Sequence, residues 1–491
     1  MKFIYTKKIF RTVFIMGIVC CQIIRAQDNT FYYMRNVPQV TSLNPANQPP
    51  SNFFVSIPLS VIQLNASNNA VSLNDIFFKN QDDSISRFYQ TNATTDKFLS
   101  KFDKLNYLSV NGSSDILSLG FRSKRMYFTL NYTLHENNRI MFPKELVSFL
   151  TLHIPSDVQY DLSTFNIDIT QYQELGLGIS RQFGDQITIG IRPKILFGIS
   201  TISSNTHSFS VNSDPITKNL TFTINSDIKV CAPGIIIPVD SAGAVDLNGN
   251  FNFDSANVKT TSDYIHLATQ NMGLGIDAGI NYRPIERLEF SASIIDLGYI
   301  NWSHYSHIYN VQGSYAYAGA EYNSIDSTTK SPDIIDSLKT NFKATGSESS
   351  FTTHLVPILY VGGRFFVTPK FDVGILSRFE FYKDGTKSKI TILTDWRPLE
   401  IWNVSASYGL LNGSNSTFGL GMSFRFGFFN FFIVSDDIPT TYTLIKGKTI
   451  NYPMPNDQLA YNLQFGINIV LGSSLKKKLR QDQPMYISEE Y

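Results

Sequence analysis

Cysteine is scarce in this sequence of 491 residues, which contains Cys20, Cys21 and Cys231. The first two lie in an apolar stretch near the N-terminus that we expect to be removed, and Cys231 would then be alone. A single cysteine can form neither an intramolecular disulfide nor a cysteine-based zinc site. The sequence therefore excludes a fold held together by disulfides or by a cysteine-bound zinc ion.

Charged residues are also few, at 16% of the chain, whereas about 25% is usual for a soluble protein. The net charge is +1, so no basic field indicates nucleic acid as a partner. Beyond the N-terminus, no apolar run reaches the roughly 20 residues that a membrane-spanning helix needs. Aromatic residues, in contrast, reach 13%, with 38 Phe and 25 Tyr. This composition fits a protein with much apolar surface, although a large soluble β-protein can share it.

The N-terminus has the pattern of a secretory signal peptide. A basic stretch, 1–11, precedes an apolar stretch, 12–24, and Ala26 offers a small residue before a cleavage site. An uncleaved anchor is disfavoured because the apolar stretch is shorter than a spanning helix. A lipoprotein is disfavoured because neither Cys20 nor Cys21 follows a small residue. We therefore predict an exported protein, which must cross a membrane as strands if it crosses one.

Several long stretches alternate apolar residues with polar or small ones, at a period of two that excludes a helix. They are Gln186–Ser200, Leu220–Val230, Thr417–Phe428 and Asn462–Leu471. Strands of a membrane barrel alternate in this way over about 10 residues, because one face meets lipid and the other meets the lumen. A soluble sandwich alternates too, but its strands usually have about 5–6 residues. We predict an all-β fold, a transmembrane antiparallel β-barrel of about 14 strands, within a range of about 14–16.

The lengths of the connections predict the orientation of this barrel. Short links are expected at Phe183–Gln186, Arg283–Arg287, Thr368–Lys370 and Trp396–Ile401, and long polar loops at 231–269, 301–352 and 436–458. In bacterial outer-membrane barrels the short turns face the periplasm and the long loops face outward. Helical spacing of apolar residues predicts two short helices, in 95–106 and 142–150, which we interpret as loop helices rather than parts of a plug.

We therefore divide the chain into four predicted parts. They are a signal peptide (1–26), an N-terminal segment that enters the barrel as a plug (27–52), an outer-membrane β-barrel (53–471) and a polar periplasmic tail (472–491). Many outer-membrane barrels end on an aromatic residue that closes the last strand, and the tail departs from that pattern.

The motif Asn44-Pro45-Ala46 resembles the start of FadL-type barrels, in which it belongs to a segment that enters the barrel. The stretches 273–284, 288–302 and 465–470 look like strands and a turn of the same group. The chain is thus similar to an uncharacterised family of Bacteroidota outer-membrane proteins grouped with FadL-type and PorV-type barrels. The FadL-type resemblance implies transport of a hydrophobic or amphipathic solute. The PorV-type resemblance implies, as an alternative, a secretion or assembly partner that acts through its loops.

By the alternation, several charged side chains should face the lumen. They are Arg192, Lys194, Asp277, Asp372, Arg378, Glu380 and Arg425. We expect these charges to pair with one another and stiffen the barrel, or to line a path for a solute. Gly-Leu-Gly recurs at 176–178, 273–275 and 419–421 inside predicted strands, where small residues leave room for a plug or a ligand rather than form a phosphate loop.

No catalytic motif is recognisable. A Gly-x-Ser-x-Gly elbow and the ordered Ser/His/Asn set of a barrel phospholipase are both missing from the sequence. His304 and His307 lack an acidic partner at a motif spacing, so solvated loop histidines are favoured over a metal pair. We predict a protein that is not an enzyme and uses no cofactor. Its expected partners are outer-membrane lipid, a hydrophobic small molecule or secretion-system proteins, and no nucleic acid.

Overall fold

The computed structural model describes residues 29–472, with gaps at 73–74, 76, 80–84, 88–91, 152–157, 218, 234, 237–243, 246–251, 254–268, 318–341, 400, 412–414, 440–441, 447–450 and 456–459. The predicted signal peptide (1–26) and residues 473–491 of the predicted tail lie outside the described residues. Among the described residues, no helix is both long and apolar enough to cross a membrane.

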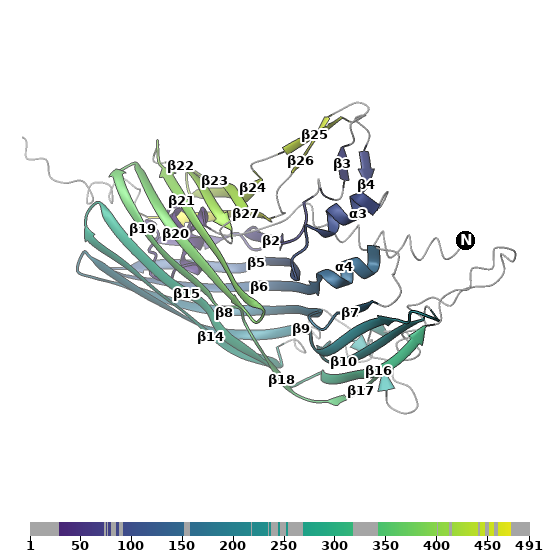
Figure 1. Cartoon of the computed structure of the whole chain (residues 1–491). Coiled ribbons are helices and arrows are strands. Elements are labelled where there is room, and N and C mark those ends of the chain that lie inside the picture. Colours follow the sequence, from purple (N-terminus) through teal and green to yellow (C-terminus); the bar gives the residue numbers. More distant parts are fainter. Residues whose placement is uncertain are drawn as a thin grey trace, which may run out of the picture.

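The chain folds into a closed antiparallel β-barrel of 14 strands (Figure 1), which confirms the predicted fold class. In chain order the wall consists of β1 (Phe53–Ser56) with β2 (Ile62–Asn68), β5 (Leu105–Ser123), β6 (Met126–Pro143), β8 (Asn166–Phe183), β9 (Ile187–Ser213), β14 (Asn271–Ile285), β15 (Leu288–Trp302), β18 (Phe351–His354) with β19 (Ile358–Thr368), β20 (Phe371–Tyr382), β21 (Gly385–Trp396), β22 (Trp402–Leu411), β23 (Asn415–Phe426), β24 (Phe429–Pro439) and β27 (Ala460–Leu471). β1 with β2, and β18 with β19, each act as one interrupted strand. The ring closes because β27 pairs with β1 and β2.

The two faces of the wall differ as a membrane barrel requires. On β23 the Phe424 side chain is 37% exposed on the outer face, whereas the neighbouring Ser423 is 5% exposed toward the lumen. Trp396 and Trp402 are exposed at the ends of β21 and β22, where an interfacial aromatic girdle is usual. An apolar outer face around a polar lumen is the architecture of outer-membrane barrels.

The four predicted short links join wall strands at one end of the barrel. Two of these hairpins, β14–β15 and β19–β20, are visible at the left in Figure 1. β20 and β21 are also joined by a short turn at the opposite end, with Tyr382 opposite Gly385 in the register. Short turns therefore predominate at the end that we interpret as periplasmic, but they also occur at the other end.

One alternating stretch, Leu220–Val230, does not belong to the wall. It forms β10 (Leu220–Cys231), which pairs with the second half of β9 and with β16 (Ser306–Tyr317), beyond the barrel end opposite the short links. β17 (Lys343–Glu348) continues this extension, seen at the lower right in Figure 1. The interpretation of Leu220–Val230 as a wall strand was therefore wrong, and the predicted loop 301–352 contains strands. The alternation arises because this sheet also buries one face, around Leu220, Phe222 and Val211.

The other described elements are short. They are the 3-10 helices η2 (Phe31–Tyr33) and η3 (Pro38–Ser42), the helices α3 (Asn92–Leu99) and α4 (Lys144–Thr151), and the strands β3 (Phe77–Lys79), β4 (Ile85–Arg87), β7 (Gln159–Asp161), β11 (Ile235–Ile236), β12 (Ala244–Val245), β13 (Asn252–Phe253), β25 (Tyr442–Lys446) and β26 (Asn451–Pro455). α3 and α4 lie at the same end as the extension (Figure 1), where Phe98 and Leu99 cluster with Val147. They overlap the two loop helices predicted in 95–106 and 142–150, but α3 ends at Leu99 and residues 105–106 already belong to β5.

Candidate functional site

The described part of the N-terminal segment, residues 29–52, fills part of the lumen. Its side chains form one buried cluster with lumen-facing side chains of the wall. From the segment the cluster contains Phe31, Tyr32, Tyr33, Met34, Val37, Val40 and Leu43, and from the wall Val61, Ile295, Tyr360, Leu376, Leu393, Phe432 and Val434. These apolar contacts remove the segment from water, which is the main favourable term in holding it there. We call residues 29–52 the plug.

The motif Asn44-Pro45-Ala46 lies against the wall strands β9 and β14. Asn44 Oδ1 accepts a hydrogen bond from the Ala46 N–H at 2.9 Å, and Asn44 Nδ2 donates to Asn281 Oδ1 on β14 at 3.1 Å. A Cβ added at Gly190 would lie 2.2 Å from the Pro45 carbonyl, and one added at Gly279 would lie 2.0 Å from Asn44 Oδ1.

These two glycines face each other across β9 and β14. Because neither glycine has a side chain, the motif can pack directly against the backbone of both strands. A larger residue at either position would clash with the motif. Of the three Gly-Leu-Gly sequences, 419–421 also approaches the plug, at Thr30 and Met34. The copies 176–178 and 273–275 pack against wall residues instead.

An ion-pair network ties the plug to the wall near the short links. Arg35 pairs with the buried Glu289 of β15, and Arg283 lies 3.0 Å from the other Glu289 oxygen. Arg364 lies 3.7 Å from Glu289 and 3.6 Å from Asp372, so it joins two carboxylates. Buried charges are tolerated when they are paired in this way.

A second network lines the middle of the lumen. Arg192 lies 2.5 Å from Asp277 and 3.6 Å from Glu174. Lys194 lies 2.9 Å from Asp277, 3.1 Å from Glu174 and 2.6 Å from Asp296. Two cations thus face three carboxylates, which leaves a small excess of negative charge on this side of the lumen.

The other predicted lumen-facing charges lie outside the network of Arg192 and Lys194. Asp372 is fully buried and lies 2.5 Å from Arg397. Arg378 pairs with Glu380 at 2.8 Å, and its Nε donates to the Tyr360 hydroxyl at 3.0 Å. Arg425 is half-buried near the short-turn end and donates to the carbonyls of Gly427 and Val470. The seven charges therefore belong to different local networks, although four of them line one cavity: Arg192, Lys194, Arg378 and Glu380.

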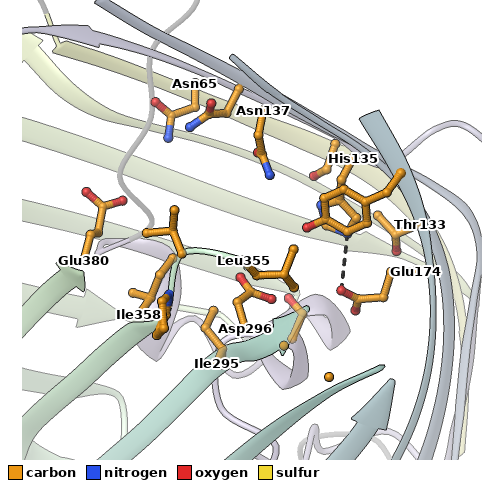
Figure 2. Close-up of a pocket in the computed structure, with 18 of the residues that line it drawn as sticks. Asn65, Thr133, His135, Asn137, Glu174, Ile295, Asp296, Leu355, Ile358 and Glu380 are labelled. Atoms are coloured by element: carbon orange, nitrogen blue, oxygen red, sulfur yellow. Dashed lines mark ion pairs between the residues drawn. The ribbon is translucent and has the colours of Figure 1, made fainter. Parts of the chain in front are cut away.

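A cavity of about 1000 Å³ lies against the plug, and Figure 2 shows some of the residues that line it. Phe31, Gln39 and Leu43 of the plug contribute to its lining, and Glu174, Arg192, Lys194 and Asp296 contribute the second ion-pair network. Figure 2 shows Asn65 and Asn137 on one side and Ile295, Leu355 and Ile358 across from them.

The wall is interrupted beside this cavity. β15 pairs with β19 up to Ile295 and Ile358, and with β18 again from Tyr299 and His354. Between these two ladders, Asp296–Gly298 face Leu355–Pro357, bridged by a hydrogen bond from Leu355 N to Gly298 O. Asp296 has a φ of 63°, and together with Ile295 it forms a bulge opposite Asp277.

Residues from both faces of the wall line the cavity at this interruption. Leu274, Ile276 and Leu297 are among the lining residues although they are 56%, 45% and 40% exposed on the outer face. Val356 and Pro357 complete the lining there. The cavity therefore reaches toward the lipid-facing side of the barrel at the interruption, which we call the wall gap.

The β20–β21 turn reaches across the cavity and contacts β6 on the other side of the barrel. Arg139 of β6 lies 2.6 Å from Asp384 in this turn. Its guanidinium also stacks on two rings, 4.1 Å from the centroid of Tyr107 and 4.0 Å from that of Tyr382. We call this contact the Arg139 latch.

Most of the cavity residues that sequence reasoning missed depend on tertiary placement, and Glu174 is the exception. Arg139 is on β6 and Asp384 is in the β20–β21 turn, and no local pattern joins them. Glu174 lies in the alternation of β8 and could have been assigned to the lumen from that signal. Asp296 lies in a bulge, where the period of two fails.

The comparisons with known proteins concern the fold and the family. No curated protein matches the sequence. In structure the chain is similar to the toluene transporter TbuX of Ralstonia pickettii, at 8% identity over 89% of this chain and 95% of that one, with a TM-score of 0.43. It is also similar to the toluene transporter TodX of Pseudomonas putida (8%, 88% and 93%, 0.40) and to a FadL homologue of Pseudomonas aeruginosa (8%, 88% and 93%, 0.39).

At such low identity these likenesses concern barrel architecture and not the solute. The model of the family of unknown function DUF5723 matches residues 45–436, which is most of the chain. The chain therefore belongs to this family of unknown function, DUF5723.

Proposed function

We propose that this barrel transports a hydrophobic or amphipathic solute across the outer membrane, by way of the lumen cavity and the wall gap. The observation that carries the proposal is that the cavity is lined both by the plug and by outer-face residues at the gap. A solute in the cavity would then have a sideways route to the membrane without crossing the plug.

The chemistry of the gap suits an apolar molecule. Leu355, Val356 and Pro357 present no side-chain hydrogen-bonding group. Opposite them Leu297 is apolar, and the Asp296 carboxylate is paired with Lys194 at 2.6 Å. Pro357 also lacks a backbone N–H, so one donor that could restore the strand ladder is missing. A hydrophobic solute passing here would exchange one apolar environment for another, at little cost in free energy.

The plug supports a lateral route rather than a straight one. Its buried aromatic cluster and the pairing of Arg35 with Glu289 occupy the lumen toward the short-turn end. A solute that moved along the barrel axis would have to break these contacts.

Filling the wall gap tests the proposal. The protein would be reconstituted in lipid vesicles, and the rate at which a fluorescent hydrophobic probe enters the vesicle membrane would be measured. Leu355→Trp should slow the entry, because the larger ring occupies the gap. Ile392→Trp is the matched control, since Ile392 is 57% exposed on the outer face and does not line the cavity. Equal rates for wild type and Leu355→Trp, with normal folding of both, would refute the lateral route.

The PorV-type role as a secretion partner and the Bacteroidota affiliation stay predictions from the resemblance. Stable co-purification of secretion components from mildly solubilised membranes would favour that role over transport.

A further inference from the structure

Polar side chains of neighbouring wall strands meet in rows on one side of the cavity. The register places Asn65 of β2 opposite Asn111 of β5, and Asn111 opposite Asn137 of β6. A second row lies two residues further along the strands. In this row Gln63 lies opposite Ser113, and Ser113 lies opposite His135. Neighbouring strands are about 4.8 Å apart, so the groups in each row are evenly spaced. We call these six residues the amide ladder.

The amide ladder is open to the cavity. All six residues line it, and Asn137 is exposed while Asn65 and Asn111 are half-buried. Asn111 Oδ1 accepts hydrogen bonds from the Ser109 hydroxyl and the Asn138 N–H, and its NH₂ group makes none to the residues that the structure describes. His135 Nε2 makes no hydrogen bond to the residues that the structure describes, but it lies 3.6 Å from Glu174 Oε2 (Figure 2), so we assign contacts with a ligand to the amides and not to this imidazole. These groups can serve a ligand that both donates and accepts hydrogen bonds.

The opposite side of the cavity combines apolar side chains with the carboxylates of Asp296 and Glu380, which are paired with Lys194 and Arg378 (Figure 2). Ile295, Leu355 and Ile358 lie across from Asn65 and Asn137 in Figure 2, and Leu43 of the plug is also part of the lining. The cavity thus has a hydrogen-bonding side and, across from it, apolar side chains that continue to the wall gap. A molecule with both a polar head and an apolar tail would satisfy both sides.

The charges around the cavity disfavour an acidic head. Arg192 and Lys194 are already paired with carboxylates, and so are Arg378 and Arg139. Lys383 also lines the cavity, but it is exposed to water in the β20–β21 turn, where pairing with an anion contributes little. To pair with one of the buried cations, an anionic head would have to displace a carboxylate, and it would approach a network with more carboxylates than cations. A neutral head needs no such exchange, because it can bind to the amide ladder directly.

We propose that the cavity binds an amphipathic solute whose head is uncharged and rich in hydroxyl groups, as in an alkyl glycoside. The head lies on the amide ladder, and the tail lies along Leu355 and Ile358 toward the wall gap. This inference rests on the proposed transport function and adds the chemical class of the head.

Binding measurements with four probes that share a decyl chain test the inference. The full chain would be placed in lipid nanodiscs, with empty nanodiscs as the background. The probes are decyl glucoside, decanoate, decyltrimethylammonium and decane. We expect decyl glucoside to bind roughly tenfold more tightly than decanoate, as one or two additional hydrogen bonds would give.

The double variant Asn65→Leu/Asn111→Leu keeps side-chain volume close to that of wild type and removes both amides. It should weaken decyl glucoside binding roughly tenfold and leave decane binding unchanged. Asn225→Leu, on β10 and away from the cavity lining, is the matched control. If the double variant does not fold, Asn65→Ser tests the same contact with a smaller change.

Equal binding of decyl glucoside and decanoate would overturn the inference, as would unchanged decyl glucoside binding in a folded double variant. If decyltrimethylammonium binds most tightly of the four probes, the inference would also be overturned. The head group would then bind to the excess of carboxylates around Arg192 and Lys194. In each of these cases binding of decane above background would leave the transport proposal standing. Failure of all four probes to bind would overturn both.

Discussion

Breaking the Arg139 latch should open the cavity at the end opposite the short links. Arg139→Ala removes the pair with Asp384 and the stacking on Tyr107 and Tyr382. Both charged side chains are mostly buried, with Arg139 at 10% and Asp384 at 16% exposure. A charge-assisted hydrogen bond of this kind contributes about 1.5–3 kcal/mol, and each cation–π contact about 0.5–2 kcal/mol.

Allowing for overlap between these terms, we expect the docked position of the β20–β21 turn to lose about 3 kcal/mol. At 1.4 kcal/mol for each tenfold change, this shifts the docked-to-undocked ratio by roughly 100-fold. Arg139→Lys should lie between wild type and Arg139→Ala, because it retains the charge but loses the planar stacking.

Thiol labelling reads out this shift. Asn137→Cys places a thiol in the cavity lining, and its rate of reaction with a membrane-impermeant maleimide measures access from solution. We expect faster labelling in the Arg139→Ala background. Lys383→Ala is the control, since Lys383 is exposed in the same turn. If Arg139→Ala and Lys383→Ala label at the wild-type rate, the turn does not limit access and the reasoning is refuted.

Three further changes test other parts of the structure. Phe424→Arg should prevent folding or strongly destabilise the folded barrel, because a cation on the lipid face costs about 2–4 kcal/mol. Ser423→Arg should be tolerated better, because Ser423 faces the lumen. Heat-modifiable migration on gels measures the folding of both variants, and equal tolerance would contradict the register. Gly190→Ala should displace Pro45 and loosen the plug, with an overpacking cost of about 1–3 kcal/mol, and it should raise the conductance measured in planar bilayers. Gly112→Ala is the control, because its added Cβ would lie 3.5 Å from the nearest atom, and it should change neither stability nor conductance. Burial raises the pKa of the Cys231 thiol to about 12, so the folded protein should not react with maleimide at pH 8; after denaturation mass spectrometry should find one labelled thiol, and three would contradict removal of residues 1–26.

The period of two predicted the fold class, because it reports which side chains share a face, and the strand number of 14 lies within the predicted range of about 14–16. The period does not report which medium that face meets. Leu220–Val230 alternates as cleanly as a wall strand, yet it packs its apolar side around Val211 in the extension. Only the pairing of β10 with β9 and β16 separates the two cases, and pairing is not a local property of sequence.

The candidate site was less accessible to sequence reasoning than the fold. One row of the amide ladder is formed by Asn65, Asn111 and Asn137, which are far apart in the chain and meet because the register aligns them. Asp296 occupies a bulge, where alternation cannot assign a face. The alternation can therefore indicate that a side chain faces the lumen, but the partner it meets there depends on strand order and register.

The plug has a consequence for the order of folding. Gln39 exchanges hydrogen bonds with Asn468 of β27, at 2.7 and 3.0 Å, across a separation of 429 residues. β27 is also the strand that closes the ring against β1 and β2. The plug therefore cannot complete its contacts with the wall until β27, the last strand, has paired with the sheet. Contacts of such long sequence separation form slowly, so ring closure and plug capture should be one late, shared step of assembly.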